Sequence, residues 1–123
     1  MDQREIAVRA AKALDAKRAK EIIVLKVDEM TVITDYMVIA TGRSVPQVKA
    51  LCEHVEEELA KEDVFARRRE GMSEGLWCVL DYGDVMVHVF HEQDREYYQL
   101  ERLWADGTNE IGVEYDAADA GQA

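Results

Sequence analysis

The stretch that decides the fold covers residues 75–104 and reads GLWCVLDYGDVMVHVF (75–90), HEQD (91–94) and REYYQLERLW (95–104). Two almost wholly apolar runs flank a short turn at Gly83-Asp84, a pattern that predicts an antiparallel hairpin of two strands. Residues 95–105 are then predicted to form the last helix, with Asp94 as its cap and Gly107 as its stop. Strands that are apolar at consecutive positions are buried on both faces, so helices must pack on the sheet.

The preceding residues add the other elements. A helix is predicted over 2–19, where Asp2 and Glu5 resemble a capping box, and apolar strands over 21–27 and 35–42. Ser44, with Gln47 three residues later, opens the clearest helix, and residues 64–70 could form a short strand. We therefore predict an α/β fold: a mixed β-sheet with helices packed on it. One domain is expected over residues 1–110, followed by an acidic, mobile C-terminal tail over 111–123.

Charge and composition narrow the function. The chain has 123 residues, of which 48% are hydrophobic, and a formal net charge of −11. A phosphate backbone would repel so acidic a protein, and its dense basic cluster, Arg67 to Arg69, is followed directly by Glu70. Direct binding of nucleic acid as the main activity is disfavoured, and a basic protein partner fits the charge better. Cys52 and Cys78 lack metal-ligand spacing, and the sequence shows neither a signal peptide nor a membrane span, so a reduced, cytoplasmic protein is expected.

Metal and nucleophile chemistry find little support in the sequence. His88 and His91 are three residues apart on a predicted strand, a spacing that points them to opposite faces. Ser44 is explained as a helix cap, and neither cysteine has an obvious basic activator. Asp81 and Asp84 flank a turn, where aspartate is ordinary. We expect no catalytic residue, no metal and no cofactor.

The segment ATGRS at 40–44 is more suggestive, because nucleotidyltransferase-type enzymes hold a phosphate at a helix N-terminus that follows such a strand. These enzymes also need carboxylates on an adjacent strand to bind magnesium. The candidate strand, VMVHVF, presents Met86, His88 and Phe90 on one face and valines on the other. Activity of this kind is therefore not expected.

The aromatic residues remain. In the last helix an inward stripe is predicted for Tyr97, Leu100, Leu103 and Trp104, whereas Tyr98 and Glu101 could face solvent or a partner. Trp77 lies beside an exposed turn and near acidic residues, as an interface anchor would; the alternative is that it is a core residue.

The same residues resemble the ribosomal silencing factor family, also called the Iojap-like family. The matching elements are ITDYMVIATGRS at 33–44, the helix that begins PQVKAL, the pair EG at 70–71, GLWCVLDYGDVMVHVF at 75–90 and REYYQLERLW at 95–104. They occur in family order over nearly all of residues 3–105.

The resemblance implies a nucleotidyltransferase-like fold without the catalytic carboxylates. It implies a translational repressor that binds the large ribosomal subunit through a basic ribosomal protein at the intersubunit face, with little direct RNA contact, and that blocks subunit joining sterically. It leaves a homodimer open. By motif position, the partner-binding residues are Trp77 as the aromatic anchor and Glu70, Asp81 and Asp84 as acidic partners, with Tyr98 and Glu101 as additions.

Two alternatives stay open. One is a small nucleotidyltransferase-like or hydrolytic enzyme that uses Ser44, Asp81 and Asp84. The other is an interaction module for a different basic protein.

Overall fold

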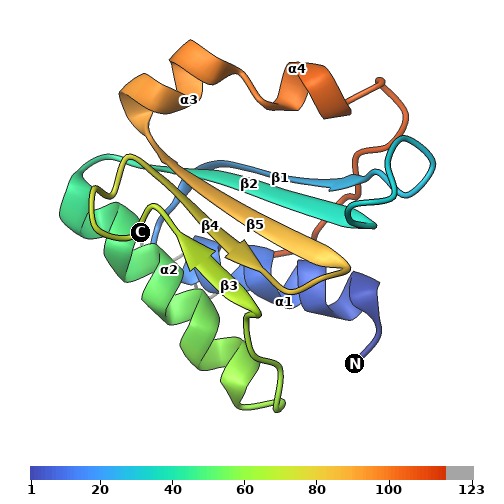
Figure 1. Cartoon of the computed structure of the whole chain (residues 1–123), viewed down its shortest axis with the longest axis horizontal. Helices are drawn as coiled ribbons and strands as arrows, with labels where there is room; N and C mark the ends of the chain where they lie inside the picture. Colours follow the sequence, from blue (N-terminus) through green and yellow to red (C-terminus); the bar gives the residue numbers. More distant parts are fainter. Residues whose placement is uncertain (116–123) are drawn as a thin grey trace.

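The computed structural model describes residues 1–115, and the order of their helices and strands follows the predicted order closely (Figure 1). The elements are α1 (Gln3–Ala16), β1 (Lys20–Lys26), β2 (Tyr36–Gly42), α2 (Val45–Ala60), β3 (Arg68–Glu70), β4 (Trp77–Asp81), β5 (Val85–His91), α3 (Glu92–Tyr98) and α4 (Glu101–Trp104).

The described strands form one mixed sheet in the order β1-β2-β5-β4-β3. The central pair, β2 and β5, is parallel, and the three other pairs are antiparallel. The predicted α/β fold with a mixed sheet is therefore confirmed. The register places Tyr36 beside Val85 at one end of the sheet, and Thr41, Phe90 and Trp77 in one row near the other end.

Helices cover the sheet on two sides (Figure 1). We call the side that packs on α1 and α2 face A, and the side that packs on α3 and α4 face B. Because successive strand residues point to opposite sides, β5 turns its valines to face A and its Met86, His88 and Phe90 to face B.

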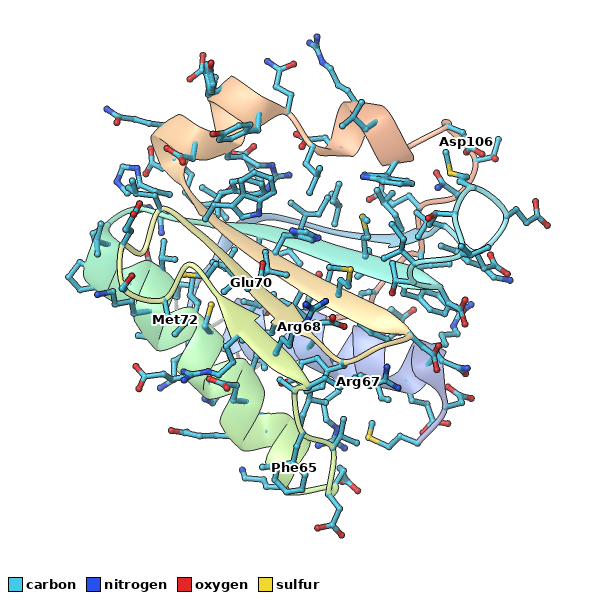
Figure 2. All side chains as sticks on the ribbon, viewed as in Figure 1. Phe65, Arg67, Arg68, Glu70, Met72 and Asp106 are labelled. Carbon is cyan, nitrogen blue, oxygen red and sulfur yellow. The ribbon has the colours of Figure 1, made fainter. Side chains whose placement is uncertain are left out.

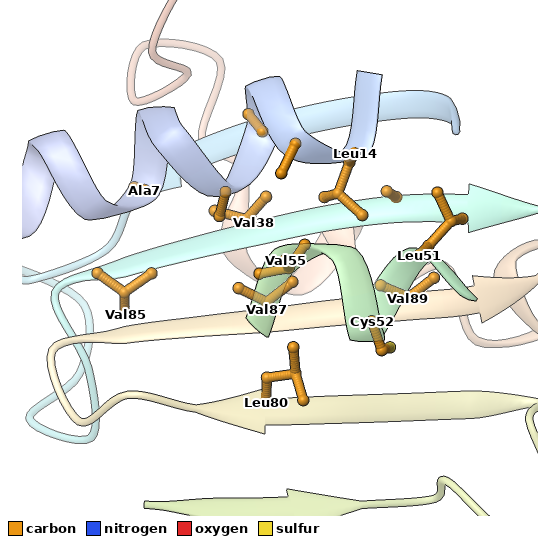
Figure 3. Close-up of a cluster of buried hydrophobic side chains, with 14 of the residues drawn as sticks. Ala7, Leu14, Val38, Leu51, Cys52, Val55, Leu80, Val85, Val87 and Val89 are labelled. Atoms are coloured by element: carbon orange, nitrogen blue, oxygen red, sulfur yellow. The ribbon is translucent and has the colours of Figure 1, made fainter. Parts of the chain in front are cut away.

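The larger core lies between face A and helices α1 and α2 (Figure 3). Leu51 and Val55 of α2 and Leu14 of α1 are completely buried against the strand valines. Burial of each such side chain stabilises the fold by about 1.5–3 kcal/mol. Small residues on the inner side of α1, such as Ala7 and Ala10, let this helix approach the sheet closely.

Both long helices begin at the predicted caps. The Asp2 carboxylate accepts a hydrogen bond from the Glu5 amide at 2.8 Å, and the Ser44 hydroxyl accepts one from the Gln47 amide at 3.2 Å. Each bond satisfies an amide that has no carbonyl partner in the first helical turn. Ser44 therefore has the structural role that its position predicted.

The prediction of a single helix over 95–105 is wrong. Gln99 has φ 46 and ψ 50, a left-handed conformation that ends α3 at Tyr98, and α4 starts again at Glu101. The start was also misplaced, because the side chain of His91, not Asp94, caps α3 by accepting from the Gln93 amide.

This break changes which residues face the sheet. Leu100 is buried and Trp104 is partly buried on face B, as predicted. Tyr97 and Leu103 were expected on the same inward stripe, but 78% and 70% of their surfaces are exposed. The stripe assumed one uninterrupted helix, but the left-handed Gln99 divides it, so Tyr97 of α3 and Leu103 of α4 do not share a helical face with Leu100.

The C-terminal segment packs further than expected. Glu110 pairs with Leu25, the Ile111 amide donates to the Val24 carbonyl at 2.8 Å, and Val113 packs against the core. The packed chain thus continues past residue 110, where the domain boundary was expected. The rest of the expected tail, residues 116–123, lies outside the described residues.

In residues 1–115, Cys52 and Cys78 are both buried and form no disulfide. No helix within this range has the length and apolar character needed to cross a membrane.

Candidate partner-binding surface

Gly71 positions the start of β4. It has φ +79, and a Cβ atom there would lie 2.0 Å from the Trp77 carbonyl oxygen, so only glycine lets the turn pass this close to the strand. The Gly75 amide closes the turn by donating to the Gly71 carbonyl at 3.0 Å. Trp77 therefore begins β4 at a place fixed by backbone packing.

Trp77 is the centre of an aromatic cluster on face B. Its ring lies 4.9 Å from the ring of Phe90 and 4.8 Å from that of Tyr98, measured between centroids. Tyr97 adds an edge-to-face contact with Tyr98 at 4.9 Å. Trp77 itself is partly buried, so it is neither a fully enclosed core residue nor a freely projecting one. Such an indole presents a rigid, preoriented surface.

A hydrogen bond fixes the orientation of Trp77. Its indole N–H donates to Nδ1 of His88 at 3.1 Å. Because Nδ1 accepts, the neutral imidazole carries its proton on Nε2, and Nε2 has no partner among the described residues. Burial lowers the pKa of His88 to about 4, so the ring stays neutral at physiological pH. A neutral His88 thus holds the indole of Trp77 in one orientation.

Helices α3 and α4 leave part of face B uncovered. On β1 and β2 the face B residues Leu25, Met37 and Ile39 are buried. Toward the β3 edge, Val79 and Met86 are only partly buried, and Glu70 is exposed. We call the uncovered part, which is made by Trp77, Val79, Met86, Glu70 and Asp81, the open surface of face B.

Val79 and Met86 were not singled out from the sequence. Their signal was present, because residues 77, 79 and 81 alternate onto one side of a strand. The alternation could not show how much of face B the helices α3 and α4 cover. If these helices covered the whole face, Val79 and Met86 would be ordinary core residues.

The predicted acidic residues differ in how freely they can bind a partner. Glu70 lies on the edge strand β3, opposite Val79, and Figure 2 shows it near Arg68. One oxygen of Asp81 accepts from the Gly83 amide at 2.8 Å, and the other lies 3.6 Å from Arg68. Asp84 is exposed in the hairpin turn. Glu70 and Asp84 are thus available, whereas Asp81 is partly engaged in the turn.

Glu101 has an internal partner. Its carboxylate accepts from Nε of Arg95 at 3.2 and 3.3 Å, and Arg95 is buried and also donates to the Thr41 hydroxyl at 2.9 Å. Glu101 and Tyr98 were expected one helical turn apart, but the break at Gln99 separates them. Tyr98 is 48% exposed and remains in contact with Trp77.

The sheet register shows which predicted residues come together. Trp77 and Tyr98 lie at one end of face B, Glu70 lies near its middle at the β3 edge, and Asp81 and Asp84 lie at the opposite end. They form an elongated surface and not a pocket. Residues 77 to 81 of a strand span roughly 13 Å.

The three residues of the enzyme alternative do not form one site. Ser44 follows the C-terminal end of β2, whereas Asp84 precedes the N-terminal end of the parallel strand β5, so they lie at opposite ends of the sheet. In residues 1–115, no group of three or more histidine, cysteine or acidic residues could hold a metal ion.

The sequence and the fold of this chain are similar to those of one class of protein. The family model for the ribosomal silencing factor during starvation matches residues 1–123. The ribosomal silencing factor RsfS of Bacillus subtilis is 39% identical over 106 residues, which are 86% of this chain and 90% of that protein. The chloroplastic protein Iojap of Zea mays is 33% identical over 83% of this chain and 44% of its own length.

A solved structure shows the same similarity. A crystal structure of a protein from Chromobacterium violaceum has a TM-score of 0.83 and 37% sequence identity, over 96% of this chain and 97% of that one. The chain belongs to the ribosomal silencing factor family.

Proposed function

We propose that this chain represses translation by binding the large ribosomal subunit through a basic ribosomal protein at the intersubunit face. The protein bound at that face sterically blocks joining of the small subunit. The observation that carries the proposal is the open surface of face B, where a fixed tryptophan and the partly exposed Val79 and Met86 are bordered by Glu70 and Asp81. Family membership supplies the ribosome as the setting.

Charge supports a protein partner. The net charge is −11, and two of the three consecutive arginines are already paired, Arg68 with Asp81 and Arg69 with Glu56. Phosphates would be repelled, whereas a lysine- and arginine-rich protein would be attracted and oriented. Contact with RNA is therefore expected to be small.

The proposal includes no catalytic step. Steric exclusion needs occupancy and no turnover, and the β5 residues on face B, Met86, His88 and Phe90, offer no carboxylate for a magnesium ion. We place this action in the cytoplasm. Light scattering of the free protein would test the homodimer that the family resemblance leaves open.

Subunit joining tests the proposal directly. Purified large and small subunits, mixed with the protein before magnesium is raised, are expected to stay separate in a sucrose gradient. Glu70→Lys should weaken the block about tenfold or more, because a lysine would then face basic groups of the partner. Glu53→Lys makes the same change at an exposed position of α2 and should block joining like the unaltered protein.

Normal subunit joining in the presence of saturating unaltered protein would contradict the proposal. Equal effects of Glu70→Lys and Glu53→Lys would remove Glu70 from the binding surface.

A further inference from the structure

The loop of residues 27–35, between β1 and β2, holds apolar side chains in water. Val32 is fully exposed, Ile33 is 68% exposed and Met30 is 44% exposed. The loop backbone is nevertheless well bonded: the Met30 and Thr31 amides donate to the Val27 carbonyl, and the Ile33 amide donates to the Thr31 hydroxyl. A bonded loop that projects adjacent β-branched side chains is typical of a contact surface, since their exposure gains nothing for the isolated fold.

Acidic residues surround these side chains. The Asp84 carbonyl accepts from the amides of Asp35 and Tyr36, which places the hairpin turn directly against the loop. On the other side, the Asn109 side chain donates to the Lys26 carbonyl and contacts the Met30 sulfur, so the segment after α4 also adjoins the loop. Six carboxylates lie near the loop, and Lys26 is an exposed basic residue beside them. The acidic residues are Asp28, Glu29, Asp35, Asp84, Asp106 and Glu110.

We propose that Met30, Val32 and Ile33, which we call the loop patch, form a second contact with the basic protein that the open surface of face B binds. In this contact the partner buries the apolar side chains and places lysines or arginines against the surrounding carboxylates. The inference rests on the proposed function and adds a surface to it.

The position of the loop patch fits one partner that covers both surfaces. The loop adjoins the Asp84 end of the hairpin, and Trp77 lies at the other end, opposite Phe90. The seven residues of β5 between these ends span roughly 20 Å. An interface of ordinary size covers this distance.

Charge distinguishes between the possible partners of the loop patch. A second copy of this chain would bring one predominantly acidic group against another, and RNA would bring phosphates against it. Both arrangements are repulsive, whereas a basic protein is attracted.

The test compares two exposed apolar positions. A Val32→Ser, Ile33→Ser double variant and a matched control, Phe65→Ser, are titrated against purified large subunits and measured by cosedimentation. Phe65 is 67% exposed, and Figure 2 shows it far from Asp106, at the opposite side of the molecule. The double variant is expected to bind roughly tenfold more weakly or worse, and Phe65→Ser like the unaltered protein.

Each result separates the two proposals. Equal binding by the double variant and the unaltered protein overturns the loop patch and leaves the proposed function standing. Failure of the unaltered protein to bind large subunits overturns the proposed function, and the loop patch with it. Loss of a dimeric mass in the double variant, measured by light scattering, would show that a second copy occupies the patch and would also overturn the inference.

Discussion

His88 connects the core of this molecule to its proposed binding surface. It is buried between strands, accepts the Trp77 indole proton and has no partner for Nε2 in the described part of the chain. Protonation of Nδ1 would place two donors against each other and a charge in an apolar environment. The orientation of Trp77 therefore depends on a neutral His88.

Stability should fall in mild acid for this reason. The pKa of His88 is about 4 in the folded protein against an ordinary value of 6.5, so between these values the unfolded chain binds a proton that the folded protein does not. The free energy of unfolding is expected to decrease by ~3 kcal/mol from pH 6.5 to pH 4 on this account. Urea unfolding of His88→Gln should lack this part of the pH dependence, because glutamine can accept from Trp77 without titrating.

His54→Gln is the control, since it removes a partly exposed histidine on α2. If His88→Gln and the unaltered protein lose stability in parallel over this pH range, His88 is not the group responsible.

The segment of α3 and α4 shows what can and cannot be predicted from the sequence. The hairpin, the caps at Asp2 and Ser44 and the burial of Leu100 follow from local pattern, because each depends on residues close together in the chain. The break at Gln99 does not. Beside the break, Arg95 donates to Glu101 and to Thr41, a residue 54 positions away in the chain, and a contact over that distance leaves no local sequence pattern.

The proposed binding surface has a similar mixture of local and long-range features. Its acidic and aromatic residues were predicted by motif position from the resemblance to the family, and that prediction stays a prediction. The uncovered part of face B could not be predicted, because it depends on how far two short helices extend over the sheet. The ion pair of Glu101 was hidden for a related reason, because the burial of its partner Arg95 is a property of the packed chain and not of the local sequence.

Glu101 should accordingly matter for stability. Glu101→Gln leaves the buried Arg95 guanidinium without its carboxylate, and the side chain of Glu101 is 30% exposed, so water screens part of the loss. The free energy of unfolding is expected to fall by about 1–2 kcal/mol in chemical denaturation. Glu96→Gln, at an exposed position of α3, should change it by less than about 0.5 kcal/mol.

An unchanged stability in Glu101→Gln would mean that the ion pair contributes little. The carboxylate of Glu101 would then be available to a partner, as its motif position suggested.

At the scale of the whole molecule, the two faces of the sheet differ in how completely helices cover them. Face A and its two long helices supply most of the core, and face B is covered over β1 and β2 but open toward β3 (Figure 1). Carboxylates border the apolar positions on the open surface and in the loop patch, with Arg68 and Lys26 as the basic residues beside them. This arrangement suits a protein that acts by occupying a basic site on a larger assembly.

Oxidative footprinting of the unaltered protein tests that account most directly, because it requires no substitution in the aromatic cluster. Hydroxyl radicals modify exposed aromatic side chains, and the modification of each is compared for the protein free in solution and bound to purified large subunits. Modification of Trp77 and Tyr98 is expected to fall several-fold on binding, whereas Phe65 should be modified equally in both states. Bound protein with Trp77 and Tyr98 as reactive as in the free state, and with Phe65 protected, would contradict the assignment of the open surface of face B as the docking surface.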